Sequence, residues 1–183
     1  NIGPINYIII PEHKKSDPKI YDEGLHIGRV NIIRPTENIL NTHLNTLSKL
    51  NCILGSIEAN KLGYDEGIMD DINGNISTCN STNLFFVLKD EVWTSTGKYC
   101  LNGITRDKAI SICNNNNIDC SETNFIFDDI EDCDEAFVTG TFAGIIPVSK
   151  IEDRKLNSTN TDSLVNKIRT LYIKEIQNYV KLA

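Results

Sequence analysis

The sequence predicts an α+β fold in which a mixed β-sheet packs against helices. Segments with the apolar patterns of strands interleave with stretches of helical periodicity, without the strict β-α-β repetition of a parallel sheet. The dipeptide Asn73-Gly74 separates two short strand-like runs and marks a tight hairpin. The 183 residues suffice for one hydrophobic core, or for one core and a small appendage.

The first third of the chain predicts two strands and a long helix. Residues 5–11 form a continuous apolar run and predict a buried strand, and residues 24–33 alternate loosely and predict a second strand. The helix is expected over residues 44–62, and Gly63 stands where a C-cap glycine belongs. We expect its apolar face to pack on the sheet; this face consists of Leu47, Leu50, Ile53, Leu54 and Ile57.

The middle of the chain predicts two hairpins followed by a helix. The first hairpin turns at Asn73-Gly74, and the second spans residues 87–94 around Lys89-Asp90. Trp93 in the second hairpin is expected in the core or at an interface. A helix is expected over residues 105–116, with its N-terminus presented by the turn Asn102-Gly103.

The last third predicts a short helical turn, two strands and a long helix. We expect the turn over residues 128–131, the strands over residues 134–139 and 144–148, and a polar loop over residues 150–161. Residues 163–182 form an amphipathic helix whose apolar face is built on Leu164, Ile168, Leu171, Ile176 and Tyr179.

Composition limits the partners and the compartment. The net charge of −7 and the pI near 4.9 argue against nucleic acid, which binds basic surfaces. No apolar run approaches the ~20 residues that span a bilayer, and the first residues lack the pattern of a signal peptide, so no membrane partner is expected. The six cysteines show no CxxC spacing, and we interpret them as reduced thiols of a cytoplasmic protein.

Three sequence blocks, in a fixed order, carry a family resemblance. The first block is EANKLGYDEGIMDD followed by NLFFV, the second is LNGITR, and the third is CDEAFVTGT followed by GIIPV. They resemble the class IV (fold type IV) pyridoxal-phosphate aminotransferases, which include branched-chain and D-amino-acid aminotransferases and aminodeoxychorismate lyase. The resemblance implies that residues 24–183 are the large C-terminal domain, with a barrel-like core. Residues 1–23 would then be the remnant of a small N-terminal domain and its connector.

The resemblance implies a phosphate site and pyridoxal phosphate as the cofactor. Gly103, Ile104 and Thr105 match the turn that presents a helix N-terminus to the phosphate in the family. Free backbone amides and the helix dipole favour an anion there. Thr141 matches a threonine whose hydroxyl and amide also face the phosphate.

Two catalytic positions depart from the family pattern. The Schiff-base lysine of the family falls on Asn45, whose amide is not nucleophilic, and Lys49 lies one helical turn later. The glutamate that keeps the pyridine nitrogen protonated falls on Thr78, whose hydroxyl can bond that nitrogen but cannot balance its charge. These departures leave open whether the chain still binds the cofactor.

The sequence therefore favours a catalytically degenerate aminotransferase domain that keeps the phosphate cradle. We expect a homodimer or a complex with a sister subunit, with uncovered apolar surface around Trp93 and Phe137. Two alternatives stay open: an active transaminase or lyase for amino acids and 2-oxo acids with a relocated lysine, or a non-catalytic interaction module. No metal site is expected, because the aspartate pairs Asp70-Asp71 and Asp128-Asp129 lie at predicted turns.

Overall fold

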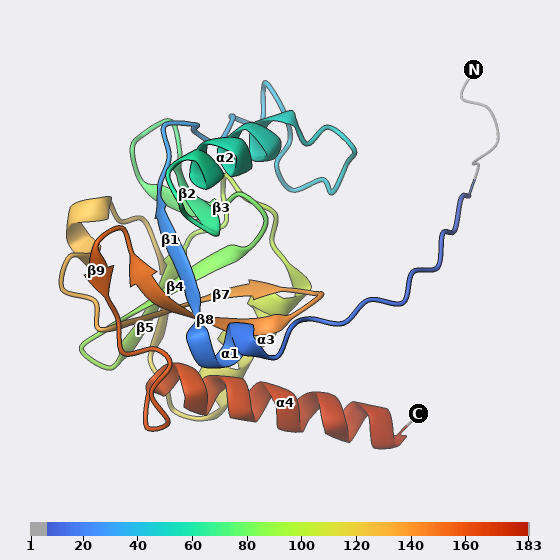
Figure 1. Cartoon of the computed structure of the whole chain (residues 1–183), viewed down its shortest axis with the longest axis vertical. Coiled ribbons are helices and arrows are strands. Elements are labelled where there is room, and N and C mark those ends of the chain that lie inside the picture. The colour runs from blue at the N-terminus through green and yellow to red at the C-terminus, as the bar shows by residue number, and fades with distance from the viewer. Residues whose placement is uncertain (1–6, 183) are drawn as a thin grey trace.

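The computed structural model describes residues 7–182, and within them nine strands form one sheet flanked by helices (Figure 1). The helices are α1 (Lys19–Glu23), α2 (Leu50–Lys61), α3 (Ile104–Asn115) and α4 (Leu164–Leu182), with a 3-10 turn at Phe127–Ile130. The strands are β1 (Leu25–Arg29), β2 (Glu66–Asp70), β3 (Ile76–Cys79), β4 (Asn83–Leu88), β5 (Glu91–Ser95), β6 (Cys120–Thr123), β7 (Glu135–Gly140), β8 (Gly144–Ile151) and β9 (Arg154–Lys155).

The sheet is mixed and curls toward a barrel. Its strand order is β3-β2-β1-β8-β7-β4-β5-β6, with β9 paired to β8, and both parallel and antiparallel neighbours occur. The two ends of this order meet, because the amide of Ile76 in β3 donates to the carbonyl of Phe125 just after β6, over 2.8 Å. The hydroxyl of Ser95 in β5 also donates to the carbonyl of Ser77 in β3, over 2.7 Å. The expected α+β class and barrel-like core are confirmed.

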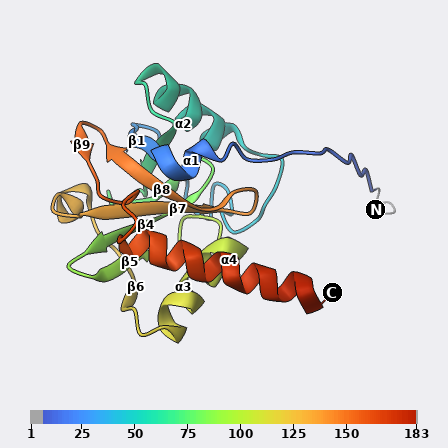
Figure 2. The same ribbon diagram turned by 60° about the horizontal axis from the view of Figure 1, so that its bottom comes forward.

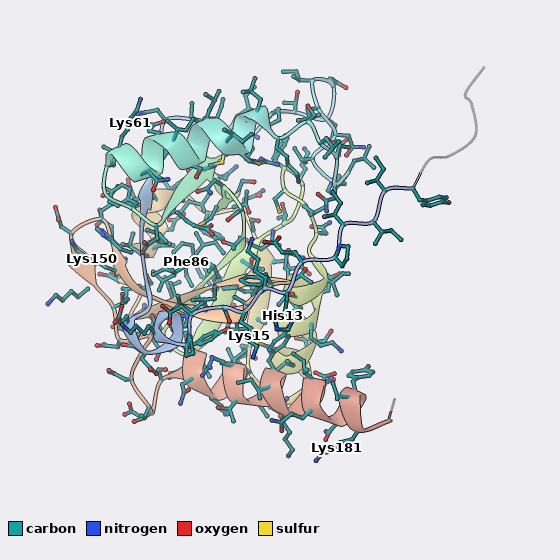
Figure 3. All side chains as sticks on the ribbon, turned by 45° about the vertical axis from the view of Figure 1, so that its right-hand side comes forward. His13, Lys15, Lys61, Phe86, Lys150 and Lys181 are labelled. Carbon is teal, nitrogen blue, oxygen red and sulfur yellow. The ribbon has the colours of Figure 1, made fainter. Side chains whose placement is uncertain are left out.

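Alternating side chains of the strands supply two core layers. Phe86 points into the layer enclosed by the curled sheet, whereas its neighbour Phe85 points to the layer beneath α3 and α4. The ring of Phe85 stacks on that of Phe137 with centroids 4.5 Å apart. Figure 2 shows α2 and α4 on opposite sides of the sheet, and Figure 3 shows Phe86 in the interior between them, with Lys181 at the outer end of α4.

Most expected elements have their counterparts in the structure. The two hairpins turn where predicted: Gly74 has φ +83°, and Lys89 and Asp90 both have positive φ. Gly63, with φ +82°, ends α2 as a C-cap glycine. Short elements that the sequence analysis missed are α1 and β6, and residues 150–161 are not simply a loop, because β8 continues to Ile151 and pairs with β9. No helix within residues 7–182 is long and apolar enough to cross a membrane.

The predicted strand at residues 5–11 is wrong for residues 7–11, which form no strand and are exposed; residues 5–6 lie outside the described residues. An apolar run alone does not identify a pairing partner, and Figure 1 shows this segment leaving the body of the molecule. The expected apolar surface around Trp93 and Phe137 is also wrong. Phe137 is fully buried, and Trp93 is partly buried against the inner core layer.

The predicted helix over residues 44–62 begins later, at Leu50, and its apolar face does not pack on the sheet. Gly55 and Ala59 are its buried residues. A Cβ atom at Gly55 would lie 3.1 Å from the Met69 sulfur, so α2 approaches the sheet too closely for a large side chain. The large apolar residues expected to be buried are therefore exposed: Leu47, Leu50, Ile53, Leu54 and Ile57.

We predict that Asp71→Ala destabilises the fold by about 1–3 kcal/mol. The buried carboxylate of Asp71 accepts the backbone amides of Asn73 and Asn75, at 2.7 and 3.0 Å, and so holds the β2–β3 turn. Urea unfolding followed by circular dichroism measures the change, with the exposed Asp132→Ala as control. Equal stability of the two variants would contradict this role of Asp71.

Candidate functional site

The turn Asn80–Asn83, between β3 and β4, lies at the centre of the candidate site. The side-chain oxygen of Asn80 accepts the amide of Gly67 in β2 at 2.6 Å, which fixes the turn to the neighbouring strand. The amide of Cys79 donates to the carbonyl of Thr82 at 3.0 Å and closes the turn. Every other part of the site is placed relative to this turn.

The start of α3 is attached to the turn through Asn83. The side-chain amide of Asn83 donates to the carbonyl of Leu101 at 2.9 Å. The position of Asn83 also explains why residue 103 is a glycine. A Cβ atom at Gly103 would lie 2.6 Å from the Asn83 side-chain oxygen. Among residues 7–182 no side chain caps the N-terminus of α3, so its first backbone amides are free of a capping group, as an anion site requires.

The predicted cradle residues differ in exposure. Thr105 is buried in the first turn of α3, whereas Ile104 and Thr141 are exposed and Gly103 is half-buried. A Cβ atom at Gly140, directly before Thr141, would lie 3.5 Å from the methyl group of Thr82. The GIT and TGT blocks therefore both adjoin the turn Asn80–Asn83, although they are far apart in the sequence.

A cavity of about 470 Å³ opens beside this turn. Its wall includes Thr78 and the turn itself, together with Glu66 of β2, Leu101, and residues from the segment between β1 and α2. Among the residues expected to carry catalysis, Thr78 and Lys49 line the cavity. Within the described residues no cluster of three or more His, Cys, Asp or Glu side chains is arranged to hold a metal ion.

Arg34 is a cavity residue that the sequence analysis did not single out. It is only 7% exposed, and its guanidinium donates to three neutral acceptors: the carbonyl of Tyr99, the side-chain oxygen of Asn51 and the sulfur of Cys52. The buried hydroxyl of Thr42, also in the cavity wall, has no hydrogen-bond partner among the described residues. A buried cation bonded to neutral groups is suited to an anionic ligand. In the sequence, the alternation of Arg34 with the apolar residues Val30 and Ile32 was the signal that its side chain points inward.

Asn45 and Lys49 lie in the segment that leads into α2. Lys49 is exposed, and its ammonium donates to the side-chain oxygen of Asn45 at 2.7 Å. The two residues are thus neighbours, as the helical spacing suggested, although helix α2 begins only after them. An exposed, hydrogen-bonded ammonium lacks the desolvated surroundings that turn a lysine into a nucleophile.

Thr78 and Glu66 lie on adjacent strands of the cavity wall. The hydroxyl of Thr78 donates to the carbonyl of Thr82 at 2.7 Å, so it presents only acceptor lone pairs to a ligand. The carboxylate of Glu66 accepts hydroxyl groups of Ser81 and Thr82, at 2.6 and 2.7 Å. Burial raises the pKa of Glu66 above its ordinary value, and these two hydrogen bonds offset part of that rise.

The fold and this site define a domain of the aminotransferase type. The family Amino-transferase class IV matches residues 2–151, and the chain belongs to this family. The chain is 31% identical over 169 residues to branched-chain-amino-acid aminotransferase-like protein 2 of Arabidopsis thaliana, covering 91% of this chain and 30% of that protein. It is 31% identical over 154 residues to a putative branched-chain-amino-acid aminotransferase of Methanocaldococcus jannaschii, covering 83% and 53%. The chain thus spans about a third to a half of these relatives.

Solved structures show the same fold. A branched-chain aminotransferase of Thermoproteus uzoniensis with norvaline superposes with a TM-score of 0.75 at 29% identity, covering 81% of this chain and 50% of that one. An aminotransferase of Brucella abortus bound to pyridoxal phosphate superposes with a TM-score of 0.78 at 24% identity, covering 90% and 56%. The expected family and fold are confirmed.

Pyridoxal phosphate fits only part of this site. The uncapped start of α3 and the buried Arg34 suit a phosphate group. The sequence analysis expects the lysine position at Asn45 and the carboxylate position at Thr78, whose proton is donated to Thr82. On that expectation these two residues do not fit the chemistry of the cofactor, so no reaction step can be assigned to them.

We predict that Glu66→Gln gains stability relative to the wild type as the pH rises from about 4 to about 7. Because the folded-state pKa of Glu66 is raised, its contribution to stability is present at low pH and is lost as the carboxyl ionises. Glutamine stays neutral and avoids this loss. Urea unfolding at both pH values measures the difference, with the exposed Glu131→Gln as control. A stability difference between the Glu66→Gln variant and the wild type that does not change with pH would contradict the raised pKa.

Proposed function

We propose that this chain is a class IV aminotransferase domain that binds an anionic, phosphate-bearing ligand but does not catalyse transamination. The observation that carries the proposal is the contrast within one site. The start of α3 is uncapped and next to a cavity with a buried arginine, whereas Asn45 and Thr78 occupy the positions of the amine and the carboxylate. Pyridoxal phosphate is the ligand that the family suggests.

The electrostatics of the cavity support an anionic ligand. Arg34 is buried among neutral acceptors and therefore retains an uncompensated positive charge. The amides at the start of α3 add the partial positive charge of a helix N-terminus. The carboxyl group of Glu66 has a raised pKa, which weakens the repulsion of an anion.

Lys49 supports one alternative, an active enzyme whose lysine has moved. It lines the cavity and lies beside Asn45, so it is the lysine to test. The substrates would then be an amino acid and a 2-oxo acid, as the names of the relatives suggest. Its exposure and its hydrogen bond to Asn45 make it the weaker candidate.

The exposed face of α2 supports an assembly with a second copy of this chain. Leu50, Ile53, Leu54 and Ile57 form a continuous apolar stripe beside the cavity, and Ile53 also lines the cavity.

The proposal includes the domain division at residue 23, a cytoplasmic location, and a homodimer or a sister subunit as partner. The third possibility, an interaction module without a ligand, would use the same stripe.

We predict that the unmodified chain converts a branched-chain amino acid and 2-oxoglutarate no faster than free pyridoxal phosphate does. Neither Asn45 nor Thr78 can supply the amine or the charge that the reaction needs. Product formation by chromatography and borohydride trapping of a lysine-linked cofactor measure the outcome. Activity above this background that disappears in Lys49→Ala would overturn the proposal and assign the role to Lys49; Lys155→Ala is the exposed control.

We predict that Arg34→Gln weakens binding of pyridoxal phosphate by roughly 10- to 150-fold, since a hydrogen bond to a charged group contributes about 1.5–3 kcal/mol. Gly103→Ala should weaken binding as well, because its Cβ would meet the side-chain oxygen of Asn83. Calorimetric titration with pyridoxal phosphate and with inorganic phosphate measures both. Unchanged affinity in both variants, with intact circular dichroism, would place the anion elsewhere.

We predict that the chain self-associates and that Leu54→Glu shifts it toward the monomer, because the charge would enter an apolar interface. The matched control is Ile126→Glu, since Leu54 and Ile126 are both 43% exposed but only Leu54 lies on α2. Sedimentation equilibrium measures the masses. A wild-type monomer, or an equal effect of both substitutions, would count against the α2 face.

A further inference from the structure

Two cysteines meet at the far end of α3, away from the cavity. Cys113 lies in the last turn of α3 and is fully buried, and Cys120 begins β6 and is half-buried. Both belong to the core layer beneath α3 and α4. Cys113 is a buried member of this layer, and Cys120 packs against the layer from the start of β6.

The intervening loop brings the chain back from the end of α3 to the start of β6. The carbonyl of Cys113 accepts the amides of Asn116 and Ile118, at 3.1 and 3.0 Å, so the chain turns back immediately after the helix. Asn117, with φ +53°, takes the left-handed conformation that completes the turn. Cys120 is then fixed by its pairing with Val92 in β5. Backbone hydrogen bonds on both sides thus hold the start of β6 near the end of α3.

Cys120 is also accessible to small molecules. It lines a polar hollow of about 600 Å³ together with Glu91, Asn117 and Ser121. The hydrogen bond from Cys113 lowers the pKa of the Cys120 thiol, and the same contact together with burial raises the pKa of Cys113. The more exposed sulfur is thus the more reactive one, with a buried thiol beside it.

We propose that Cys120 and Cys113 are a peroxide-sensitive thiol pair that closes to an intramolecular disulfide. The Cys120 thiolate attacks one oxygen of hydrogen peroxide, the O–O bond breaks, and the departing hydroxide takes up a proton to leave as water. The sulfur of Cys113 then attacks the sulfenic sulfur of Cys120 and displaces hydroxide, which takes the Cys113 proton and leaves as a second water. Two thiols are oxidised and one peroxide is reduced.

The remaining cysteines lack this arrangement. Cys52 and Cys133 accept hydrogen bonds from the guanidinium groups of Arg34 and Arg154. Cys79 and Cys100 are buried, and burial raises the pKa of both thiols above the ordinary value. The proposed modification is therefore specific to the end of α3 and independent of the cavity and its ligand.

The test oxidises the reduced full chain with hydrogen peroxide and digests it with a protease that cleaves before aspartate. Cleavage before Asp119 separates the two cysteines, so a disulfide between them appears as two joined peptides that reduction releases. We expect these joined peptides in the wild type and in the control Cys52→Ser, which removes the other half-buried cysteine. They should be lost completely in Cys120→Ser.

A second measurement keeps the proposal falsifiable if a core substitution unfolds the chain. In Cys113→Ala the sulfenic acid on Cys120 has no partner, so dimedone labelling of Cys120 should increase over the wild type. Should Cys113→Ala fail to fold, the comparison of wild type, Cys52→Ser and Cys120→Ser decides alone. Joined peptides involving another cysteine, or oxidation of the folded wild type without a Cys113–Cys120 link, would overturn the proposal.

Discussion

The structure depends on the turn Asn80–Asn83, because it joins four segments that are distant in sequence. Asn80 binds it to β2, and Asn83 binds it to the loop before α3. Thr82 lies against Gly140 at the β7–β8 turn, and Asn80 lies against Gly55 of α2. These contacts use buried amide groups and glycines, which tolerate little displacement. The turn therefore fixes the start of α3 and the wall of the cavity relative to each other, whichever residues carry chemistry there.

On the proposed assignment, two charged residues of the family pattern are replaced by the neutral Asn45 and Thr78. Asn45 is exposed beside Lys49, whereas Thr78 is buried in the wall of the cavity. Thr78 instead donates its proton to the carbonyl of Thr82 and becomes part of the turn. On the proposed assignment, the change removes chemistry and keeps the fold.

The sequence correctly predicted the features that depend on a few neighbouring residues, such as turns and short motifs. Asn73-Gly74 and Lys89-Asp90 specify their hairpins through backbone conformation, and the ordered blocks around Gly103 and Thr141 identified the family. The hydrogen-bond partners of Arg34 could not be predicted, because they lie on Tyr99 and on α2, which only the tertiary fold brings near. The placement of Cys120 near the end of α3 depended on the missed strand β6 in the same way.

The orientation of α2 shows why periodicity alone is insufficient. The spacing of its apolar residues correctly indicated a helix, but two kinds of face could meet the sheet: the large apolar stripe, or the face with Gly55 and Ala59. The close approach to Met69 and Asn80 selects the small residues. The segment that leads into α2 lines the cavity through Thr46, Ser48 and Lys49. The outward apolar stripe is therefore a consequence of how the cavity is built, and any partner that covers it also borders the cavity through Ile53.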